Sequence, residues 1–356
     1  MTRIHETLLW LCSIPSPIGE ERALCDAVAA RLGRLSLPAP MRRYGDSIVV
    51  PITRGTGGPR ITLAGHLDVV RTQHDGPARI EGDRLYGAGA ADMKSGLAAM
   101  IELVETTPLS SLRCDLTLVF YAREEGPFAE NELGPVLDQD PELGKQDFAV
   151  CLEPSDNRLG LGCNGSLHAT VSFRGRTAHS SRPWQGENAI HKAASFLHAL
   201  GQRAPIEYRD GELVYRTVTS ATMATGGRGR NIVPDVFELN VNHRFTPDTS
   251  LEKAKADLLA LVGDGPDVDV VFIDESPSAP TFSAHPEVAR LVAAGVAGVE
   301  PKQAWTDVAR LAAHGVPAVN WGPGVNAQAH QKNEWTLLPL LDEGLAILER
   351  WLVTTA

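Results

Sequence analysis

The stretch RITLAGHLDVV, residues 60–70, decides the fold of this chain. Its apolar first half has the length of one buried strand, and polar residues follow where that strand runs out. The segments DLTLVFYAREEG and DFAVCLEP, residues 115–126 and 147–154, repeat this arrangement. Segments with helical spacing alternate with them, in SPIGEERALCDAVAARLGRL (residues 16–35) and KSGLAAMIELVE (residues 94–105). The alternation predicts the α/β class, with a mostly parallel sheet flanked by helices.

The pattern changes between residues 166 and 279, where it reads strand, helix, two strands, helix and strand. That order predicts a compact α+β domain inserted into the first one. The chain has 356 residues, more than the roughly 250–300 at which a single core stops growing, which also favours two domains. We therefore expect one domain from residues 1–165 and 280–356, and an inserted domain from residues 166–279.

Composition narrows the classes of partner. The formal net charge is −11, and no long basic run offsets it. Proteins that bind nucleic acids neutralise phosphates with clustered Lys and Arg, so the charge argues against a nucleic-acid partner. No stretch approaches the ~18 apolar residues of a membrane helix, and the N-terminal residues lack a signal-peptide pattern. We therefore expect a cytoplasmic protein that has no membrane partner.

Five imidazole and carboxylate side chains stand in five separate segments, mostly where predicted strands end: His66, Asp92, Glu125, Glu153 and His330. Ligands of open α/β sheets gather beyond the carboxyl ends of the strands, so we expect these side chains to converge. Imidazoles and carboxylates without a thiolate suit zinc, with cobalt or manganese as substitutes. Three carboxylates and a bridging hydroxide balance two divalent ions, which predicts two Zn²⁺ per chain. Paired ions activate water and polarise a carbonyl, so the pattern favours amide hydrolysis.

Two more carboxylates accompany the five. Adjacent side chains at a strand end point in different directions, so Glu125 can bind metal while Glu124 moves protons as the general base. Asp68 lies two residues after His66 and is spaced to accept the ring proton and orient the imidazole. Taken singly, each of these residues is more often a loop or capping residue. Their shared position at strand ends carries the hypothesis.

The segments GHLDVV, GAADMKSG, AREEG, CLEP and AHQKNEW, in this order, resemble the co-catalytic zinc amidohydrolase and peptidase family. That family includes acetylornithine deacetylases, succinyl-diaminopimelate desuccinylases and glutamate carboxypeptidases. The resemblance spans essentially the whole chain and implies a zinc-binding catalytic domain with an inserted lid and dimerisation domain. It implies that His66 and Glu153 bind one zinc. Glu125 and His330 would bind the other, with Asp92 bridging the two.

The inserted domain carries further matches to this family. In RGRTAHSSRPWQGENAI, residues 174–190, His179 matches a histidine that reaches the active site from the partner subunit and stabilises the oxyanion. The match implies a homodimer formed through the lid domain, although action of His179 within its own chain stays open. RGRNIVPD and NVNHRF match segments in which an Asn and an Arg contact substrate, here Asn231 and Arg244.

The segment AWTDVARLAAHGVPAVNWGPG, residues 304–324, resembles the actinobacterial desuccinylases of the family more closely than its acetylornithine deacetylases. This implies a small-molecule N-acyl amino acid as substrate, namely N-succinyl-LL-2,6-diaminopimelate, an intermediate of lysine and diaminopimelate biosynthesis. Arginine suits the carboxylates of such a substrate, so we expect Arg182, Arg244 and Arg310 to bind them. The resemblance also places two residues near the substrate's amino end, Thr306 and Asp307.

Two alternatives stay open. Another N-acyl-amino-acid hydrolase of the same fold, such as an acetylornithine deacetylase, a dipeptidase or a carboxypeptidase, would differ in the charge of its substrate. A non-catalytic binding protein would keep the fold alone. The complete ligand set and Glu124 argue against the second alternative, because a scaffold has no need of a proton shuttle.

Overall fold

The computed structural model describes residues 1–353 and divides the chain into two compact units. The first unit comprises Met1–Gly162, Thr281–Lys302 and the chain from Thr306 onward. The second comprises Cys163–Pro280 together with Gln303–Trp305. The first unit is therefore discontinuous in sequence, and it is completed by C-terminal segments.

An eight-stranded sheet with the order β1-β2-β6-β3-β7-β17-β8-β16 forms the middle of the first unit. Its central strands β6, β3, β7 and β17 run parallel, whereas β1, β2 and the β17–β8 contact pair antiparallel. The α/β class and the mostly parallel sheet are confirmed. The strands are β1 (Arg42–Tyr44), β2 (Ser47–Pro51), β3 (Arg60–His66), β6 (Asp115–Tyr121), β7 (Phe148–Cys151), β8 (Leu159–Leu161), β16 (Val299–Pro301) and β17 (Ala318–Asn320).

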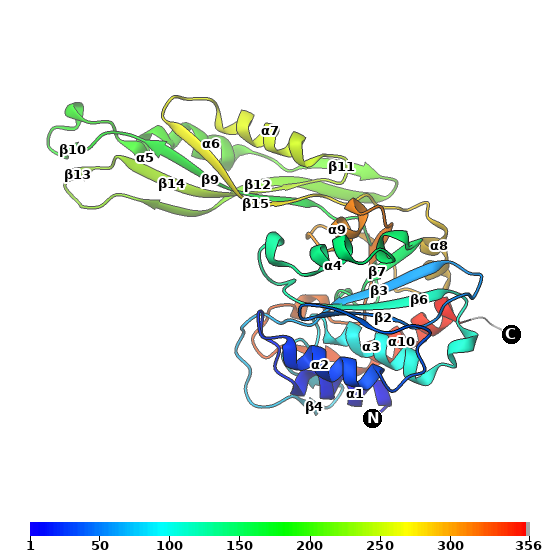
Figure 1. Cartoon of the computed structure of the whole chain (residues 1–356). Coiled ribbons are helices and arrows are strands. Elements are labelled where there is room, and N and C mark those ends of the chain that lie inside the picture. Colours follow the sequence, from blue (N-terminus) through cyan, green and yellow to red (C-terminus); the bar gives the residue numbers. More distant parts are fainter. Residues whose placement is uncertain (354–356) are drawn as a thin grey trace. The chain divides into compact units, whose positions relative to one another are not determined.

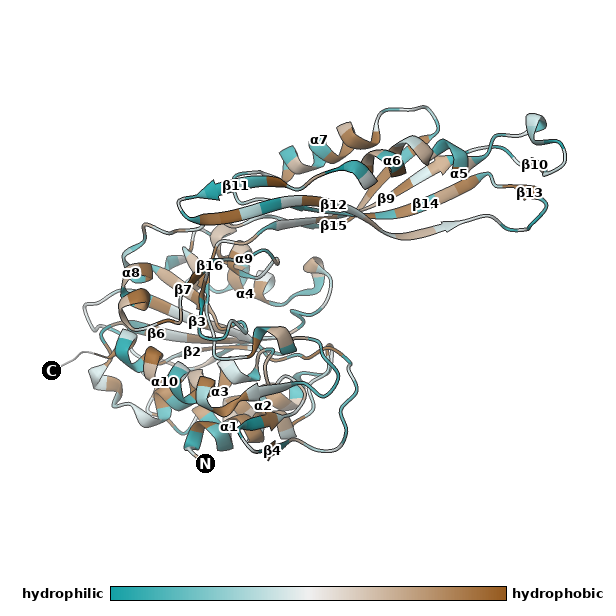
Figure 2. Cartoon of the chain, turned by 180° about the vertical axis from the view of Figure 1, so that it is seen from behind, coloured by the Kyte–Doolittle hydropathy of each residue, from teal (hydrophilic) through white to brown (hydrophobic). Residues whose placement is uncertain are grey.

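Helices cover both faces of this sheet (Figure 1). Helices α1, α2, α3 and α10 lie on one face, and α4 and α9 lie on the other. Figure 2 shows brown, apolar residues in these strands: β7 is apolar throughout, and β6 is apolar except for Asp115, Thr117 and the hydroxyl of Tyr121, so both faces of the sheet need a cover. The helices are α1 (Arg3–Ser13), α2 (Arg22–Leu32), α3 (Lys94–Thr106), α4 (Leu133–Gln139), α8 (Pro286–Ala293), α9 (Val308–Ala313) and α10 (Leu338–Leu352).

The strand register aligns the carboxyl ends of the central strands. His66, the last residue of β3, pairs with Tyr121, the last residue of β6. On the other side of β3, Ala64 pairs with Cys151 at the end of β7. Residues that follow β3, β6 and β7 therefore leave the sheet at the same edge, which is where the predicted ligands stand.

Helix α2 begins later than the sequence pattern predicts. The predicted helical spacing begins after Ser16 and Pro17, but the helix spans Arg22–Leu32. Residues before it bond to the chain that leaves β3: Val69 N–H donates to the Ser16 carbonyl at 3.0 Å, and the Ser16 hydroxyl donates to the Leu67 carbonyl at 2.7 Å. These tertiary hydrogen bonds hold the segment extended, which overrides its helical pattern.

A second small sheet, with the order β18-β5-β4, was not apparent in the sequence. It joins β4 (Arg79–Glu81) and β5 (Arg84–Tyr86) to β18 (Trp335–Leu337) near the C-terminal end of the chain. The loop that carries Asp92 leaves β5, and the segment that carries His330 enters β18. This sheet therefore brings two ligand-bearing segments together although they lie far apart in sequence.

The second unit is built on a five-stranded antiparallel sheet with the order β11-β12-β14-β9-β15. Its core contains Val171, Phe173, Phe196, Val241 and Leu258, packed between the sheet and the helices on one of its faces (Figure 1). A separate two-stranded ladder pairs β10 with β13. The elements are β9 (Gly165–Arg174), β10 (Ala178–His179), β11 (Ile206–Asp210), β12 (Leu213–Gly226), β13 (Ile232–Val233), β14 (Val236–Phe245), β15 (Val268–Ser276), α5 (Ala189–Lys192), α6 (Ala194–Gln202) and α7 (Leu251–Val262).

Short 3₁₀ turns complete the chain: η1 (Leu109–Ser111), η2 (Phe128–Glu130), η3 (Leu143–Lys145), η4 (Pro183–Gln185) and η5 (Asn326–Gln328). Among residues 1–353, none of the helices has both the length and the hydropathy that a bilayer span requires.

Candidate metal centre

His66 closes β3 and is buried, with 1% of its surface exposed. Its Nε2 atom lies 3.3 Å from Asp92 Oδ1. Its other ring nitrogen, Nδ1, lies 3.0 Å from the backbone oxygen of Asp68. An Nδ1–H donated to this carbonyl fixes the tautomer whose Nε2 lone pair can bind a metal.

Asp68 makes different contacts from the predicted one. Its carboxylate lies 3.6 Å from His66 Nδ1, so its backbone oxygen, rather than its carboxylate, orients the imidazole. The carboxylate instead accepts the backbone N–H groups of Glu124, at 3.0 Å, and Glu125, at 2.9 Å. The fully buried Asp68 therefore holds the turn that carries both glutamates.

That turn follows β6 and begins at Arg123. Arg123 has φ of 63°, in the left-handed region that side-chain-bearing residues seldom adopt, and the chain changes direction there. The Glu125 carboxylate then lies 2.8 Å from His330 Nε2. The Glu124 carboxylate lies within 4.8 Å of the ligand atoms of both His66 and Glu125, next to the cluster.

Asp92, Glu153 and His330 complete the set. Asp92 lies in the loop between β5 and α3, and Glu153 lies two residues beyond β7; these side chains belong to residues 8% and 6% exposed. His330 lies beyond η5 with φ of 61°, and its Nε2 atom is 3.5 Å from Asp92 Oδ2. All five predicted ligands therefore lie close together in the first unit, although they come from five separate segments of the chain.

The potential ligand atoms fall into overlapping groups, each spanning no more than 4.8 Å. One group contains His66, Asp92 and Glu153, and another contains Asp92, Glu125 and His330. Asp92 is common to both, and its two oxygens face different histidines. One carboxylate shared by two ligand groups is the arrangement that a pair of ions with a bridging ligand requires.

Unsatisfied atoms support the fit of these residues to a metal. Within the described residues, His66 Nε2, Asp92 Oδ1 and Glu153 Oε1 are buried and form no hydrogen bond, although His66 Nε2 and Asp92 Oδ1 lie within ion-pair distance, at 3.3 Å. Such atoms are costly unless something binds them. The donors are imidazole nitrogens and carboxylate oxygens, which zinc accepts readily.

Two carboxylates at the cluster, those of Glu153 and Glu124, resist ionisation. Burial, reinforced by the charge of Asp92, raises the pKa of Glu153 to about 7. Burial also raises the pKa of Glu124 well above its usual value, although the charge of His66 opposes this shift. The ionised form of these carboxylates is therefore unfavourable in the buried cluster, and a divalent cation would stabilise it.

The neighbouring carboxylates also raise the pKa of both imidazoles, which favours the charged form of each ring. The hydrogen bond to Glu125 raises the pKa of His330 to about 9. Burial alone would lower the pKa of His66, but its contact with Asp92 and the charges of neighbouring carboxylates hold it well above the usual value. Cations are therefore favoured at both nitrogens, and a metal ion can take the place of either proton.

The second unit holds three of the predicted residues on its surface. His179 lies in β10, where its Nδ1 atom accepts the backbone N–H of Ser181 at 3.1 Å. Asn231 lies opposite, because its carbonyl accepts the backbone N–H of Ser180 at 2.9 Å. Arg182 follows in the same loop and is exposed. The β10–β13 ladder therefore brings His179 and Asn231 together from separate motifs.

Arg244 lies on β14 of the same unit and is half-buried. Its Nε donates to the Asn242 side chain at 3.1 Å, and burial lowers the pKa of the guanidinium. Its predicted contact with substrate stays a prediction.

Thr306, Asp307 and Arg310 are buried. The Asp307 carboxylate accepts from Arg310 Nε at 3.0 Å and from Asn131 Nδ2 at 2.8 Å. Arg310 also donates to the Phe128 carbonyl at 2.9 Å and stacks on the Phe128 ring. These contacts give the segment a bracing role within the first unit, and its direct contact with substrate stays a prediction.

Sequence reasoning missed Glu334. This residue is 3% exposed and accepts three backbone N–H groups from the loop that carries Asp92. Burial is the main cause that raises its pKa to about 7. Glu334 lies four residues after His330, but this spacing did not predict its contacts. Its hydrogen bonds reach the distant Asp92 loop rather than a residue on the next turn of a helix.

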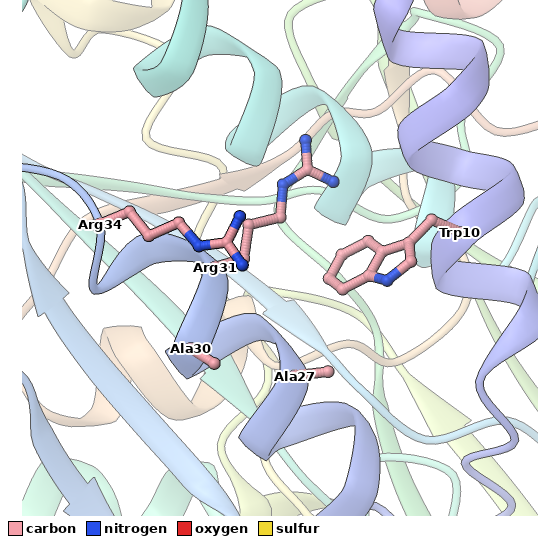
Figure 3. A pocket seen from close by; sticks show the side chains of 5 residues that line it. All are labelled: Trp10, Ala27, Ala30, Arg31 and Arg34. Carbon is pink, nitrogen blue, oxygen red and sulfur yellow. The ribbon is translucent and has the colours of Figure 1, made fainter.

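A hollow of about 410 Å³ elsewhere in the first unit is unrelated to this centre (Figure 3). It is lined by Trp10, Ala27, Ala30, Arg31 and Arg34, none of which is a predicted site residue. The Arg31 guanidinium lies 4.8 Å from the Trp10 ring centroid and binds the Glu105 carboxylate, so it joins the first two helices to α3.

A mostly parallel α/β sheet with imidazole and carboxylate side chains at its carboxyl edge defines a metallohydrolase scaffold. The model of the peptidase family M20/M25/M40 matches residues 62–354, and this chain belongs to that family. It is a hydrolase that acts on amide bonds, as the resemblance predicted.

Two sequence relatives agree with this assignment, and a solved structure shares the fold. A Corynebacterium glutamicum protein named succinyl-diaminopimelate desuccinylase is 33% identical, covering 96% of this chain and 94% of its own. A Mycobacterium tuberculosis protein, provisionally given the same name with the suffix DapE, is 38% identical and covers 96% of each chain. A tripeptidase from Staphylococcus aureus has a TM-score of 0.80 at 20% identity, covering 98% of this chain and 96% of its own, which shows the shared fold.

Proposed function

We propose that this chain hydrolyses N-succinyl-LL-2,6-diaminopimelate to succinate and LL-2,6-diaminopimelate. The observation that carries the proposal is the pair of ligand groups that share Asp92, with Glu124 beside them. Full-length similarity to proteins named as desuccinylases supports this substrate over others. The reaction belongs to lysine and diaminopimelate biosynthesis.

The ligand set supports two Zn²⁺ per chain, for which Co²⁺ is a substitute. His66 and Glu153 would hold one ion, Glu125 and His330 the other, and Asp92 both. When bound, such ions polarise the amide carbonyl and increase the acidity of water. The buried atoms of His66, Asp92 and Glu153 that form no hydrogen bond are available to bind such an ion.

Glu124 supplies the proton transfer. Its raised pKa suits a general base, because it makes this carboxylate a stronger base than an ordinary glutamate. It accepts a proton from the attacking water as the new C–O bond forms. It then delivers that proton to the amide nitrogen as the C–N bond breaks, which releases succinate and the free amine. Asp68 keeps this carboxylate in place through the backbone.

His179 supplies a hydrogen bond to the developing oxyanion. Because its Nδ1 accepts the Ser181 N–H, the neutral imidazole carries its proton on Nε2, where it can donate. We propose that it acts on the active site of a partner subunit in a homodimer. An open strand edge supports dimerisation. Among the described residues, β11 covers only Leu213–Thr217 of β12, so the rest of that edge of β12 lacks a partner strand. Met223 lies in this uncovered part and is 68% exposed.

Arginines and an amide of the second unit bind the carboxylates of the substrate. Arg182 lies three residues after His179 of β10, and Asn231 directly precedes β13, the strand that pairs with β10. Arg182 is exposed. Arg244 is the third candidate. Arg310, Thr306 and Asp307 would act by shaping the segment near the substrate's amino end, because Arg310 and Asp307 already bind each other.

The test is a parallel assay of the zinc-loaded protein with succinyl-diaminopimelate, N-acetylornithine and simple dipeptides. A clear preference in kcat/KM for the succinylated diacid supports the proposal. Faster turnover of N-acetylornithine or of dipeptides would assign the chain to another branch of the family. Binding of fewer than about one ion per chain, without chelator-sensitive amidase activity, would favour a non-catalytic protein.

A further inference from the structure

The buried carboxylate of Glu334 grips the loop that carries Asp92. Its Oε1 atom accepts the backbone N–H groups of Ala91 and Asp92, both at 2.7 Å. Its Oε2 atom accepts the N–H of Gly89 at 2.9 Å. The backbone oxygen of Glu334 accepts the N–H of Gly87 at 3.0 Å. One residue thus binds four backbone N–H groups within six positions of the loop.

The loop depends on these contacts for its shape. Residues 87–93 form turns between β5 and α3, without a strand or helix of their own. Gly89 has φ of 77°, a conformation that offers no regular hydrogen-bond pattern. Two backbone bonds within the segment, Ala90 N–H to Gly87 and Lys94 N–H to Gly89, close its turns at 3.0 and 2.8 Å. The N–H groups of Ala91 and Asp92 have the Glu334 oxygen as their acceptor.

The same residue also belongs to the segment of another ligand. Glu334 lies four positions after His330 and directly precedes β18, which pairs with β5. Its carboxylate therefore joins the His330 segment to the Asp92 loop across the small sheet. The side chains of Asp92 and His330 lie in one ligand group, so a shift of this loop would alter the spacing within that group.

We propose that Glu334 is a positioning residue, which sets the place of the Asp92 carboxylate between the two ligand groups through the backbone N–H of Asp92. Glu334 lies outside the potential ligand groups found among the described residues. The inference rests on the proposed function only in treating Asp92 as a metal ligand, and it is independent of which acyl group is cleaved. Partners of this kind, one step removed from the ligands, typically account for 10–100-fold in metal affinity or activity.

The test compares Glu334→Gln and Glu334→Ala with the wild type. Glutamine keeps the shape but has a single acceptor oxygen, so at least one of three N–H groups loses its partner. We expect zinc affinity, measured by competition with a chromogenic chelator, to fall about 10-fold for Glu334→Gln and about 100-fold for Glu334→Ala. We also expect faster hydrogen exchange in peptides that cover residues 87–93, with kcat reduced more than KM is changed.

Glu287→Gln is the matched control. Glu287 is also a buried glutamate of the first unit, and it accepts from Trp351 Nε1 at 2.8 Å and from Arg113. The control should lower the unfolding temperature while leaving zinc affinity and the exchange of residues 87–93 unchanged. A purely structural role of Glu334 would give the same result as the control.

Wild-type zinc affinity and wild-type exchange in both Glu334 variants would overturn the inference. So would rapid exchange of residues 87–93 in the wild-type protein itself, a result that needs no variant to fold. If the wild type fails to cleave succinyl-diaminopimelate but the variants still lose zinc, the proposed substrate is wrong and the positioning role stands. If desuccinylation is found and zinc affinity is unchanged in the variants, only the positioning role fails.

Discussion

The carboxylate of Asp68 accepts the backbone N–H of Glu124 at a distance of 3.0 Å, and that of Glu125 at 2.9 Å. Asp68, two residues after His66, therefore holds the backbone of the proposed general base Glu124 and of the proposed metal ligand Glu125. This contact joins the chain after β3 to the chain after β6. The backbone and the side chain of Asp68 therefore have different functions. The backbone of Asp68 orients an imidazole, and its side chain orients a turn.

Asp68→Asn should lower kcat about 10- to 100-fold, because an amide offers one acceptor oxygen to two N–H groups. Steady-state kinetics with metal content measured in parallel would check this. Asp115→Asn is a matched control, since Asp115 also accepts a backbone N–H, from Thr56 at 2.8 Å, but at the opposite end of β6. Equal losses in the two variants would contradict a specific role for Asp68.

Glu124→Gln should retain its metal and lose turnover by about 10²- to 10⁴-fold, because the amide cannot take up the proton. Metal analysis and single-turnover kinetics on the same preparation would separate the two effects. A kcat close to that of the wild type would remove Glu124 from the role of base.

His179 acting on the partner's site predicts complementation between two inactive proteins. Mixed dimers of Glu124→Gln and His179→Ala should contain one site with both groups intact, so activity should reappear when the two proteins are refolded together. If His179 acts within its own chain, every site in the mixed dimer lacks one group. Activity no higher than that of the separate variants would then be observed.

His243 predicts how the protein responds to acid. This residue lies in β14 and is 2% exposed, with Nδ1 2.8 Å from the Thr219 hydroxyl. Burial, aided by the charge of Arg203, lowers the pKa of His243 to about 4. The unfolded chain takes up this proton near pH 6.5, so the folded state loses stability as the pH falls from about 6.5 to 4.

The shift corresponds to about 3 kcal/mol across that window, with no contribution from this residue at higher pH. Denaturant unfolding of the wild type and of His243→Gln, at several pH values, should show a smaller pH dependence in the variant. His191→Gln, at an exposed position, should keep the wild-type dependence. A variant with an unchanged pH profile would mean that His243 is not the group responsible.

The sequence predicted the layout of the first unit well because its signals are local. The apolar strands that lead to His66, Glu125 and Glu153 are visible as short runs, and parallel topology then brings their ends together. The start of α2 at Arg22 was missed, because hydrogen bonds from Ser16 to the chain after β3 override a helical pattern.

The residues that position the predicted ligands were harder to predict than the ligands themselves. Glu334 and the Asp68 carboxylate bind backbone N–H groups, and a backbone donor has no signature in the identity of the residue that carries it. The pairing of β18 with β5 crosses about 250 positions, and each strand has three residues, too few to show a period.

The central claim is that Asp92 belongs to two metal sites at once. Anomalous diffraction at the zinc edge, from crystals of the zinc-loaded protein, tests this directly. We expect two peaks about 3.5–4 Å apart, one beside His66 and Glu153, the other beside Glu125 and His330, with one Asp92 oxygen on each. A single peak, or two peaks of which only one contacts Asp92, would contradict the account.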